Sequence, residues 1–449
     1  IEKLYNKIFM KCNLILWFNI KKGKIIMKKI KIGLIGLGTV GSGVFKTLYD
    51  NENIEIAKIA GRDLSKDRGI KNLDKSLLTD DAFEVVNDPE IDIVVEVMGG
   101  IHPALELIVK ALKNGKHIVC ANKELLAKHG TEIFTLARTN NRVILYEAAI
   151  AGGIPIVMPL KTVLSGNKIN KITAILNGTT NYILTKMERE QSSYDDVLLE
   201  AQKSGYAETN PKGDVEGFDA AYKIVTLATL ALGKKIDLSK VYIEGITKIR
   251  PEDMENAKEF GYRIKLIALA QITKDNKADV RVHPMLISEN HPLSSINYVT
   301  NAVMISGYPV GEIMLSGAGA GEFPTASSVI GDILTLSSEL GKSSIPLPIM
   351  RCNHEEIADM LDIKDTVNRY YLSINAKNAF GVIESLGRIF ARNKISISNL
   401  LQKGLQKDNT ANIVLITEDA CEKDMQKALE ELNNEACVNR TDSLIRLGD

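Results

Sequence analysis

An apolar, β-branched run that ends in a glycine-rich turn is the feature that most restricts how this chain can fold. From Lys29 the sequence reads KIKIGLIGLGTVGSGVFKTLYD, with the turn at Gly36-Leu37-Gly38-Thr39-Val40-Gly41 and a helical pattern after it. In a strand, turn and helix of this kind, Gly36 permits the tight turn, Gly38 lets the backbone approach a pyrophosphate, and Gly41 allows close helix packing. The helix N-terminus supplies N–H donors to phosphate. The segment therefore predicts a dinucleotide-binding site.

The second predicted strand, Ile54 to Ile59, ends where the adenosine ribose of such a ligand is recognised. The residues there are Ala60-Gly61-Arg62-Asp63. An acidic residue at this point usually binds the ribose 2′-hydroxyl, whereas an arginine accommodates a 2′-phosphate. Because Arg62 comes first and Lys66 follows, we expect NADP rather than NAD. Either charge could instead be a solvated turn residue.

Strands and helices continue to alternate along the next sixty residues. Ile91 to Val97 reads as a strand ending at Met98, Pro103 to Asn114 as a helix, and His117 to Cys120 as a strand that leads to Lys123. This order indicates a parallel, doubly wound α/β sheet, on which ligands bind beyond the carboxyl ends of the strands. We therefore expect Met98 and Lys123 to face a ligand.

The composition excludes several classes of partner. Lys plus Arg equals Asp plus Glu, 56 each, so no overall basic field attracts nucleic acid or an anionic membrane. The five cysteines are widely spaced without a CxxC pair, which favours reduced thiols and a cytoplasmic protein. The apolar patch Leu14 to Ile20 is too short to span a bilayer and lacks a signal-peptide cleavage site. We expect residues 1–26 to be an extension outside the fold, which begins at Met27.

A second chemical signal lies between Gly213 and Lys223, which read GDVEGFDAAYK before an uncharged run to Leu232. Asp219 and Lys223 are four residues apart and share a helix face. Such pairs are usually solvated surface contacts. The apolar continuation favours a buried pair, in which each charge depends on its partner because desolvation costs several kcal/mol per ion.

Six segments together resemble the homoserine dehydrogenases, in consistent order from about Met27 to about Arg351. The resemblance implies NAD(P)H-dependent reduction of L-aspartate 4-semialdehyde to L-homoserine, a step towards threonine, methionine and isoleucine. It places the general acid on Lys223, a second essential lysine on Lys123 and the substrate amine contact on Glu208. The six segments are GLGTVG, VCANKELLA, LYEAAIAGGIPI, ILNGTTNYILTKM, GYAETNPKGDVEGFDAAYK and GAGAGEFPTASSVIGD.

These roles agree with the chemistry of the residues. Hydride arriving at an aldehyde carbon leaves alkoxide character on the oxygen, which a positioned cation stabilises. The Lys223 ammonium can also deliver the missing proton, an effect worth about 10²–10⁴ in rate. Asp214 and Asp219 would hold its head group and, with Glu208, favour the cationic forms of lysine and substrate. Proton transfer directly or through water remains open.

The resemblance also assigns roles to three other segments. Asn177-Gly178-Thr179, after the strand Lys171 to Leu176, would lie beside the substrate, although a simple Asn-Gly turn is the alternative. Gly321 would approach the cofactor, and a second glycine turn is equally compatible with its sequence. Finally, a sodium-like ion would be held by the Glu147 carboxylate and the carbonyls of Ile150, Gly152 and Ile154.

The C-terminal region resembles a βαββαβ ACT domain, an amino-acid-binding regulatory module that usually pairs with another copy. The expected elements are the strands Tyr370–Asn375, Ile395–Gln402 and Ala411–Thr417 and the helices Phe380–Arg392 and Lys423–Leu432. The loop matches at Gly381 and Val382 but has Asn378 and Phe380 where Asp and Pro are common. Threonine is the effector that the resemblance implies.

The predicted fold class is α/β, in three domains, as the length suggests at about 150 residues per domain. A Rossmann-like domain at 27–150, completed by about 316–350, precedes an α+β substrate and dimerisation domain at 151–315. A linker at 351–368 leads to a ferredoxin-like ACT domain at 369–449. We expect a homodimer or homotetramer. The alternatives are a non-catalytic nucleotide and amino-acid sensor, or another nicotinamide-dependent dehydrogenase with an ACT tail.

Overall fold

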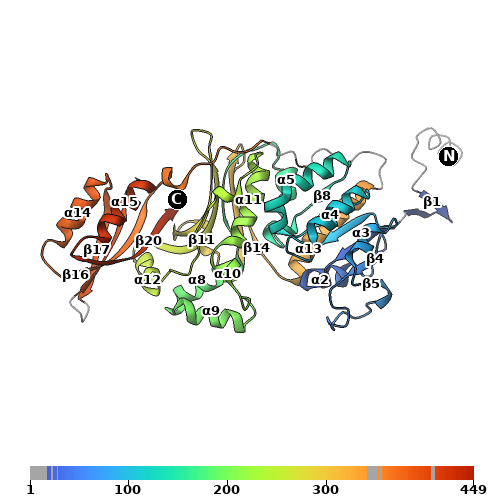
Figure 1. Cartoon of the computed structure of the whole chain (residues 1–449), viewed down its shortest axis with the longest axis horizontal. Helices are drawn as coiled ribbons and strands as arrows, with labels where there is room; N and C mark the ends of the chain where they lie inside the picture. The colour runs from blue at the N-terminus through green and yellow to red at the C-terminus, as the bar shows by residue number, and fades with distance from the viewer. Residues whose placement is uncertain are drawn as a thin grey trace. The chain divides into compact units, whose positions relative to one another are not determined.

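The computed structural model describes residues 18–21, 24–27, 29–340, 352, 356–405 and 410–448, and the chain forms two compact units (Figure 1). The first comprises residues 1–166, 229–235 and 318–355, and the second comprises residues 167–228, 236–317 and 356–449. Of the predicted extension, strands β1 (Phe18–Lys21) and β2 (Lys24–Met27) pair antiparallel. Residues 1–17 and the Pro-bearing stretch 344–348 lie outside the described residues.

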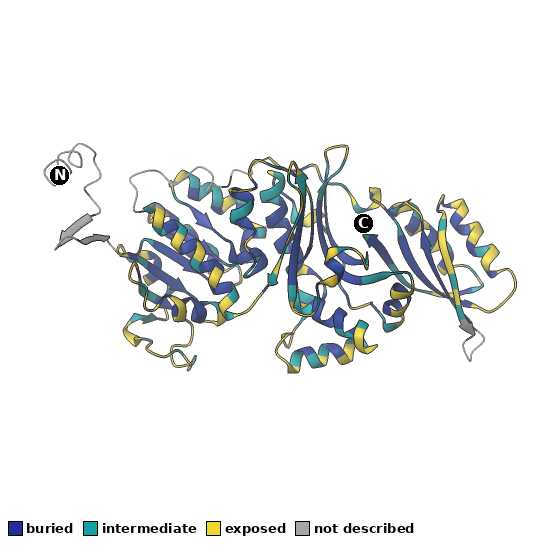
Figure 2. Ribbon diagram, turned by 180° about the vertical axis from the view of Figure 1, so that it is seen from behind, coloured by how far each residue is buried: buried dark blue, intermediate teal, exposed yellow. Residues whose placement is uncertain are grey.

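A six-stranded parallel sheet forms the centre of the first unit. Its spatial order is β5-β4-β3-β6-β7-β8, so with the first of these strands in the chain counted as one the order is 3-2-1-4-5-6. This is the doubly wound order of dinucleotide-binding domains. Strands β6 and β7 are buried along their whole length, as Figure 2 shows for the sheet, which explains their uninterrupted apolar sequences. The strands are β3 (Ile30–Ile35), β4 (Ile54–Ala60), β5 (Leu78–Thr79), β6 (Ile93–Glu96), β7 (His117–Cys120) and β8 (Ile144–Leu145).

Helix α13 (Glu322–Leu340) completes this unit far along the chain from the strands that it covers. Its residues Ala326, Val329 and Ile333 join the core formed by β3 and helix α2 (Thr39–Leu48). A side chain at Gly43 of α2 would lie 2.6 Å from the Glu322 carbonyl oxygen, so glycine permits this approach. The other helices of the unit are α3 (Ala82–Asn87), α4 (Ala104–Lys113), α5 (Lys123–Thr139), α6 (Ala148–Ala151) and α7 (Val157–Lys161).

The second unit is built on a ten-stranded sheet in the order β14-β13-β9-β11-β12-β20-β16-β18-β17, with β10 also paired to β12. Its strands are β9 (Lys168–Ile175), β10 (Tyr242–Ile243), β11 (Tyr262–Ile272), β12 (Ala278–Ser288), β13 (Thr300–Tyr308), β14 (Gly311–Ala318), β16 (Tyr370–Lys377), β17 (Ile397–Leu405), β18 (Thr410–Thr417) and β20 (Val438–Gly448). Its helices are α8 (Gly178–Glu190), α9 (Tyr194–Lys203), α10 (Lys212–Val215), α11 (Phe218–Leu232), α12 (Pro251–Glu259), α14 (Val382–Arg392) and α15 (Glu422–Asn433).

The C-terminal elements have the predicted βαββαβ order and an additional connection. The last strand, β20, pairs antiparallel with β16 inside the ACT domain and parallel with β12 outside it, with Arg446 opposite Met285. The ACT sheet is therefore continuous with the sheet of the middle region. Sequence patterns do not show this because either edge of a strand can accept a partner.

No helix within the described ranges is long and apolar enough to cross a membrane. Cys120, Cys352, Cys421 and Cys437 are free thiols.

Candidate active site

A buried ion pair lies near the start of α11 in the second unit. The side chain of Lys223 is 10% exposed and that of Asp219 is 6% exposed, and Nζ lies 2.8 Å from Asp219 Oδ2. The ammonium also donates to the carbonyl of Leu176, just beyond β9, at 2.8 Å. The buried pair that the sequence favours is thus present, and the surface alternative is wrong. Removing either charge would leave the other buried without its counter-charge.

Asn177 joins this pair to the loop that precedes it. Its Oδ1 accepts from the backbone N–H of Thr180, so Asn177 is the N-cap of α8 rather than part of an Asn-Gly turn. Its Nδ2 donates to Asp214 Oδ1 at 2.7 Å and to Asp219 Oδ2 at 2.9 Å. One amide therefore binds two carboxylates from different segments and fixes them beside Lys223.

The other predicted substrate residues border this cluster. Gly178 lies so close to Val299 that an added Cβ would be 3.0 Å from its carbonyl oxygen. Thr179 donates from Oγ1 to the carbonyl of Tyr206 at 2.7 Å. That contact holds the segment carrying Glu208, whose side chain is exposed. Thr179 therefore acts on this segment through the backbone.

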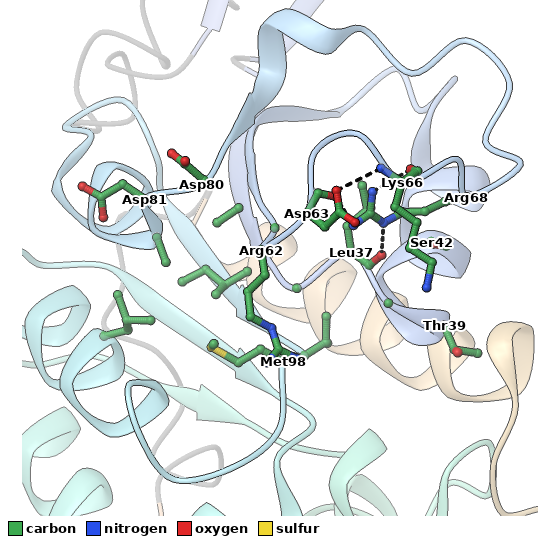
Figure 3. Close-up of a pocket in the computed structure, with 18 of the residues that line it drawn as sticks. Leu37, Thr39, Ser42, Arg62, Asp63, Lys66, Arg68, Asp80, Asp81 and Met98 are labelled. Atoms are coloured by element: carbon green, nitrogen blue, oxygen red, sulfur yellow. Dashed lines mark hydrogen bonds between the residues drawn. The ribbon is translucent and has the colours of Figure 1, made fainter. Parts of the chain in front are cut away.

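A groove of about 840 Å³ opens at the carboxyl ends of β3, β4 and β6 in the first unit (Figure 3). This is where the strand order reverses, the usual position of a dinucleotide. Gly36 has a φ of 105°, and a Cβ on Gly41 would overlap the carbonyl oxygen of Gly36, so both residues must be glycine. A Cβ on Gly38 would meet no protein atom within 4 Å, because this residue faces the open groove.

The predicted cofactor residues divide into two sets. Leu37, Thr39, Arg62 and Met98 line the groove with Gly36 and Gly38. Val40 packs instead against the hydrophobic core. Within the described part of the chain, Lys123 and Gly321 are not among the lining residues, whereas Glu322, which follows Gly321, is one of them.

The loop after β4 brings three cations to the groove: Lys66 and Arg68 lie beside Asp63, whereas the side chain of Arg62 points towards Met98 (Figure 3). Asp63 Oδ1 accepts from both the backbone and the hydroxyl of Ser65, which lowers the pKa of this carboxyl group. Arg68 donates from Nε to the carbonyl of Leu37 at 2.7 Å and so ties this loop to the glycine turn. The sequence interpretation missed Arg68, although its place in the same basic loop is a signal that could have found it.

Lys123 is the first residue of α5 and is only partly buried. A cation at a helix N-terminus is opposed by the helix dipole, so this position gives Lys123 no stabilising role in the helix. Asn122 caps the same helix and donates to the carbonyl of Gly100 at 2.6 Å. The turn that follows β6 is thereby held against the start of α5.

Glu96, at the end of β6, is a buried carboxyl group that the sequence interpretation missed. Burial raises its pKa, and Oε1 accepts from the backbone of Met98 at 2.9 Å and of Gly99 at 3.3 Å. Glu96 therefore shapes the turn that places Met98 in the groove.

The Glu147 carboxylate accepts hydrogen bonds from the backbone at the start of α7. Its Oε1 accepts from the backbone N–H groups of Ile156 and Val157, and its Oε2 accepts from that of Met158. The carboxylate thus anchors the start of α7. The carbonyl of Gly152 accepts from Ser328 Oγ at 2.7 Å. Two of the four predicted sodium ligands, the Glu147 carboxylate and the Gly152 carbonyl, thus accept hydrogen bonds from the protein, and the ion stays a prediction.

The doubly wound sheet, its glycine turn and the buried lysine–carboxylate cluster define a nicotinamide-dependent oxidoreductase with a C-terminal βαββαβ domain. Three family profiles match the chain: "Homoserine dehydrogenase, NAD binding domain" at residues 36–147, "Homoserine dehydrogenase" at residues 155–334 and "ACT domain" at residues 370–437.

Known proteins agree with these profiles. A homoserine dehydrogenase of Synechocystis is 42% identical over 431 residues, covering 93% of this chain and 99% of the relative. The crystal structure of the Thiobacillus denitrificans homoserine dehydrogenase superposes with a TM-score of 0.88 at 38% identity, covering 94% of this chain and 99% of that one. A hyperthermophilic archaeal homoserine dehydrogenase in complex with NADPH gives 0.61 at 28% identity, covering 71% and 99%. The chain belongs to the homoserine dehydrogenase family, which does not favour the sensor or the other dehydrogenase.

Proposed function

We propose that the protein interconverts L-aspartate 4-semialdehyde and L-homoserine, with Lys223 as the acid that completes reduction. The observation that carries this proposal is the buried cluster of Lys223, Asp219, Asn177 and Asp214. Its ammonium is desolvated, so its field acts at close range on an oxygen that develops negative charge.

The chain's residues would divide the work of the reaction. The bound nicotinamide supplies or accepts the hydride. Lys223 stabilises the alkoxide oxygen and transfers the proton, while Asp219 keeps its ammonium in place through the contact at 2.8 Å. The exposed carboxylate of Glu208 attracts the substrate ammonium, and Lys123 stabilises negative charge at its helix N-terminus. No step requires a metal ion, and the sodium-like ion remains secondary to this mechanism.

The test is homoserine-dependent reduction of NADP by wild type and by Lys223→Ala, with Lys203→Ala as the control. Lys203 is an exposed lysine at the end of α9. We expect the Lys223 variant to lose at least about 10² in kcat and the control to match wild type. A Lys223 variant within a few-fold of wild type would show that the acid is another group.

NADP is the cofactor that we propose. The Oδ1 atom of Asp63 already accepts three hydrogen bonds from its own loop, while Arg62 and Lys66 line the groove with charges that would bind a 2′-phosphate. For Arg62→Met we expect KM for NADP to rise about tenfold, since an exposed charge-assisted contact is worth about 1.5 kcal/mol or somewhat more, and KM for NAD to stay unchanged. Lys71→Met, an exposed charge in the same loop, is the control. Equal use of both cofactors by wild type would contradict the proposal.

We further propose that the ACT domain binds an amino-acid effector such as threonine and pairs with a second copy, which makes the protein a homodimer or homotetramer. The exposed Phe380 and Ile383, at the start of α14, support pairing because a second copy would cover their apolar surface. We also propose that the protein is cytoplasmic and acts in threonine, methionine and isoleucine biosynthesis. Assays with and without threonine, together with light scattering, test it.

A further inference from the structure

A buried arginine joins the ACT domain to the middle region of the same unit. Arg446 of β20 makes a two-pronged contact with Glu422 of α15, with Nε to Oε2 at 2.8 Å and Nη2 to Oε1 at 2.6 Å. Its remaining terminal nitrogen, Nη1, donates to Glu244 Oε2 at 3.0 Å. The guanidinium and Glu422 are each 3% exposed, so two carboxylates from distant segments share one buried cation.

Glu244 is fixed at both its backbone and its side chain. Its backbone N–H donates to the carbonyl of Val282 on β12 at 2.8 Å. Its Oε2 accepts from the hydroxyl of Tyr242 at 2.8 Å as well as from Arg446. The Arg446 guanidinium also lies over the Tyr242 ring, 4.8 Å from its centroid. Tyr242 and Arg446 therefore hold the Glu244 carboxylate together.

The residues after Glu244 pack directly on the loop that carries the active-site carboxylates. A Cβ on Gly245 would overlap the carbonyl oxygen of Val215, so backbone meets backbone here. The backbone N–H of Ile246 donates to the same oxygen at 2.8 Å. Val215 immediately follows Asp214, which binds Asn177.

We propose that Arg446 is a positioning residue for the active site, acting through Glu244 and the Gly245–Ile246 backbone on the loop that holds Asp214. Without the guanidinium, the carboxylates of Glu244 and Glu422 would repel each other at close range. Glu244 would move, because its side chain is 30% exposed whereas that of Glu422 is buried. The displacement would pass to the Val215 carbonyl, with no side chain between to absorb it. This inference rests on the proposed role of the Asp214 and Lys223 cluster.

The central experiment compares Arg446→Met with Arg440→Met. Arg440 lies on the same strand, and its side chain is 67% exposed, so the two variants remove the same charge from the same element. For Arg446→Met we expect kcat with homoserine to fall about tenfold, since misplacement by about 1 Å can cost as much as 10²-fold. The dissociation constant of NADPH should remain within about twofold, because the cofactor groove belongs to the other unit. The control should match wild type in both.

A double-mutant cycle shows whether the arginine acts through Glu244. Glu244→Gln removes the negative charge that repels Glu422, so in the Arg446→Met background it should restore part of the lost kcat. If Arg446 acts elsewhere, the two effects on ln kcat will add. The pH dependence of kcat gives a second readout, since a moved Asp214 alters the field at Lys223, whereas mere loss of stability does not.

Gly245→Ala tests the same pathway without removing a charge and serves if Arg446→Met does not fold. The added methyl group would displace Val215, and we expect a fall in kcat of at least about tenfold. Gly387→Ala in α14 is its control, because a Cβ there meets nothing within 4 Å.

A folded Arg446→Met protein with normal kcat and pH dependence would overturn the inference, as would a Gly245→Ala variant with normal kcat. Lys223→Ala separates this outcome from failure of the proposed function. If Lys223→Ala is inactive and Arg446→Met is normal, only the positioning role is wrong. If Lys223→Ala remains active, the proposed chemistry itself is wrong.

Discussion

Replacing Asp219 by asparagine removes one negative charge from the buried cluster while keeping the shape of the side chain. In the protein, Oδ2 accepts from Lys223 Nζ at 2.8 Å and from Asn177 Nδ2 at 2.9 Å. An amide oxygen in its place can still accept both hydrogen bonds. The variant therefore isolates the effect of the counter-charge on a desolvated ammonium.

The expected loss follows from burial. Breaking a buried pair by removing one charge costs about 3–5 kcal/mol, and we expect about 3 kcal/mol because the hydrogen bonds survive. An exposed pair at the same helical spacing is worth only about 0.3–0.5 kcal/mol. Glu190, which is 49% exposed, pairs with Lys186 at this spacing on α8, and Lys186, which is 14% exposed, keeps Glu200 as a second partner. Glu190→Gln is therefore the matched control.

Urea denaturation followed by far-ultraviolet circular dichroism measures both variants, and homoserine oxidation measures kcat. We expect Asp219→Asn to lower the free energy of unfolding by about 3 kcal/mol and kcat by at least about tenfold. If Asp219→Asn were no more destabilising than Glu190→Gln, the pair would not be desolvated in solution. The electrostatic argument for Lys223 would then be refuted.

Two buried titratable groups and one glycine give further expectations. Burial lowers the pKa of His117 to about 4, below an unfolded value of about 6.5. The stability that neutral His117 contributes is therefore lost as the pH falls through this window. Relative to His117→Val, the free energy of unfolding of wild type should fall by up to about 3 kcal/mol between pH 7 and pH 4. Burial raises the pKa of Asp332 to about 8, so the stability that it contributes is present at low pH and lost as the pH rises. Between pH 4 and pH 7, the free energy of unfolding of wild type should fall by roughly 4 kcal/mol relative to that of Asp332→Asn in the same denaturation assay. For Gly41→Ala, whose Cβ would overlap the Gly36 carbonyl oxygen, fluorescence titration should show at least about tenfold weaker NADPH binding, while Gly166→Ala, where a Cβ meets nothing, should bind normally.

Local signals in the sequence predicted the elements that carry the site. The β7 strand lies at the predicted residues 117–120, and the predicted helix Pro103 to Asn114 differs from α4 by one residue at each end. The spacing of Asp219 and Lys223 correctly predicted a shared helix face, and the uncharged run after them favoured the burial that the structure shows. These predictions succeeded because strand pattern, glycine turns and i,i+4 spacing depend on residues close together in the chain.

Contacts between distant segments were less accessible. Asn177 was predicted as a substrate residue, but its bonds to Asp214 and Asp219 join positions 37 and 42 residues away. Glu147 as an ion ligand stays a prediction, and what the sequence did not show is that its carboxylate accepts from the first N–H groups of α7. A carboxylate has the same sequence signature in both roles, because what differs is only which donors the fold brings to it.

By itself, the sequence determined that a glycine turn after an apolar strand starts a doubly wound sheet, and that a lysine and an aspartate share one helix face. Both follow from backbone geometry over a few residues. Only the tertiary structure decided that β20 extends the middle sheet and that Arg446 meets Glu244, 202 residues earlier. Strand edges and buried charges accept any complementary partner, so packing of the whole unit selects the one that forms.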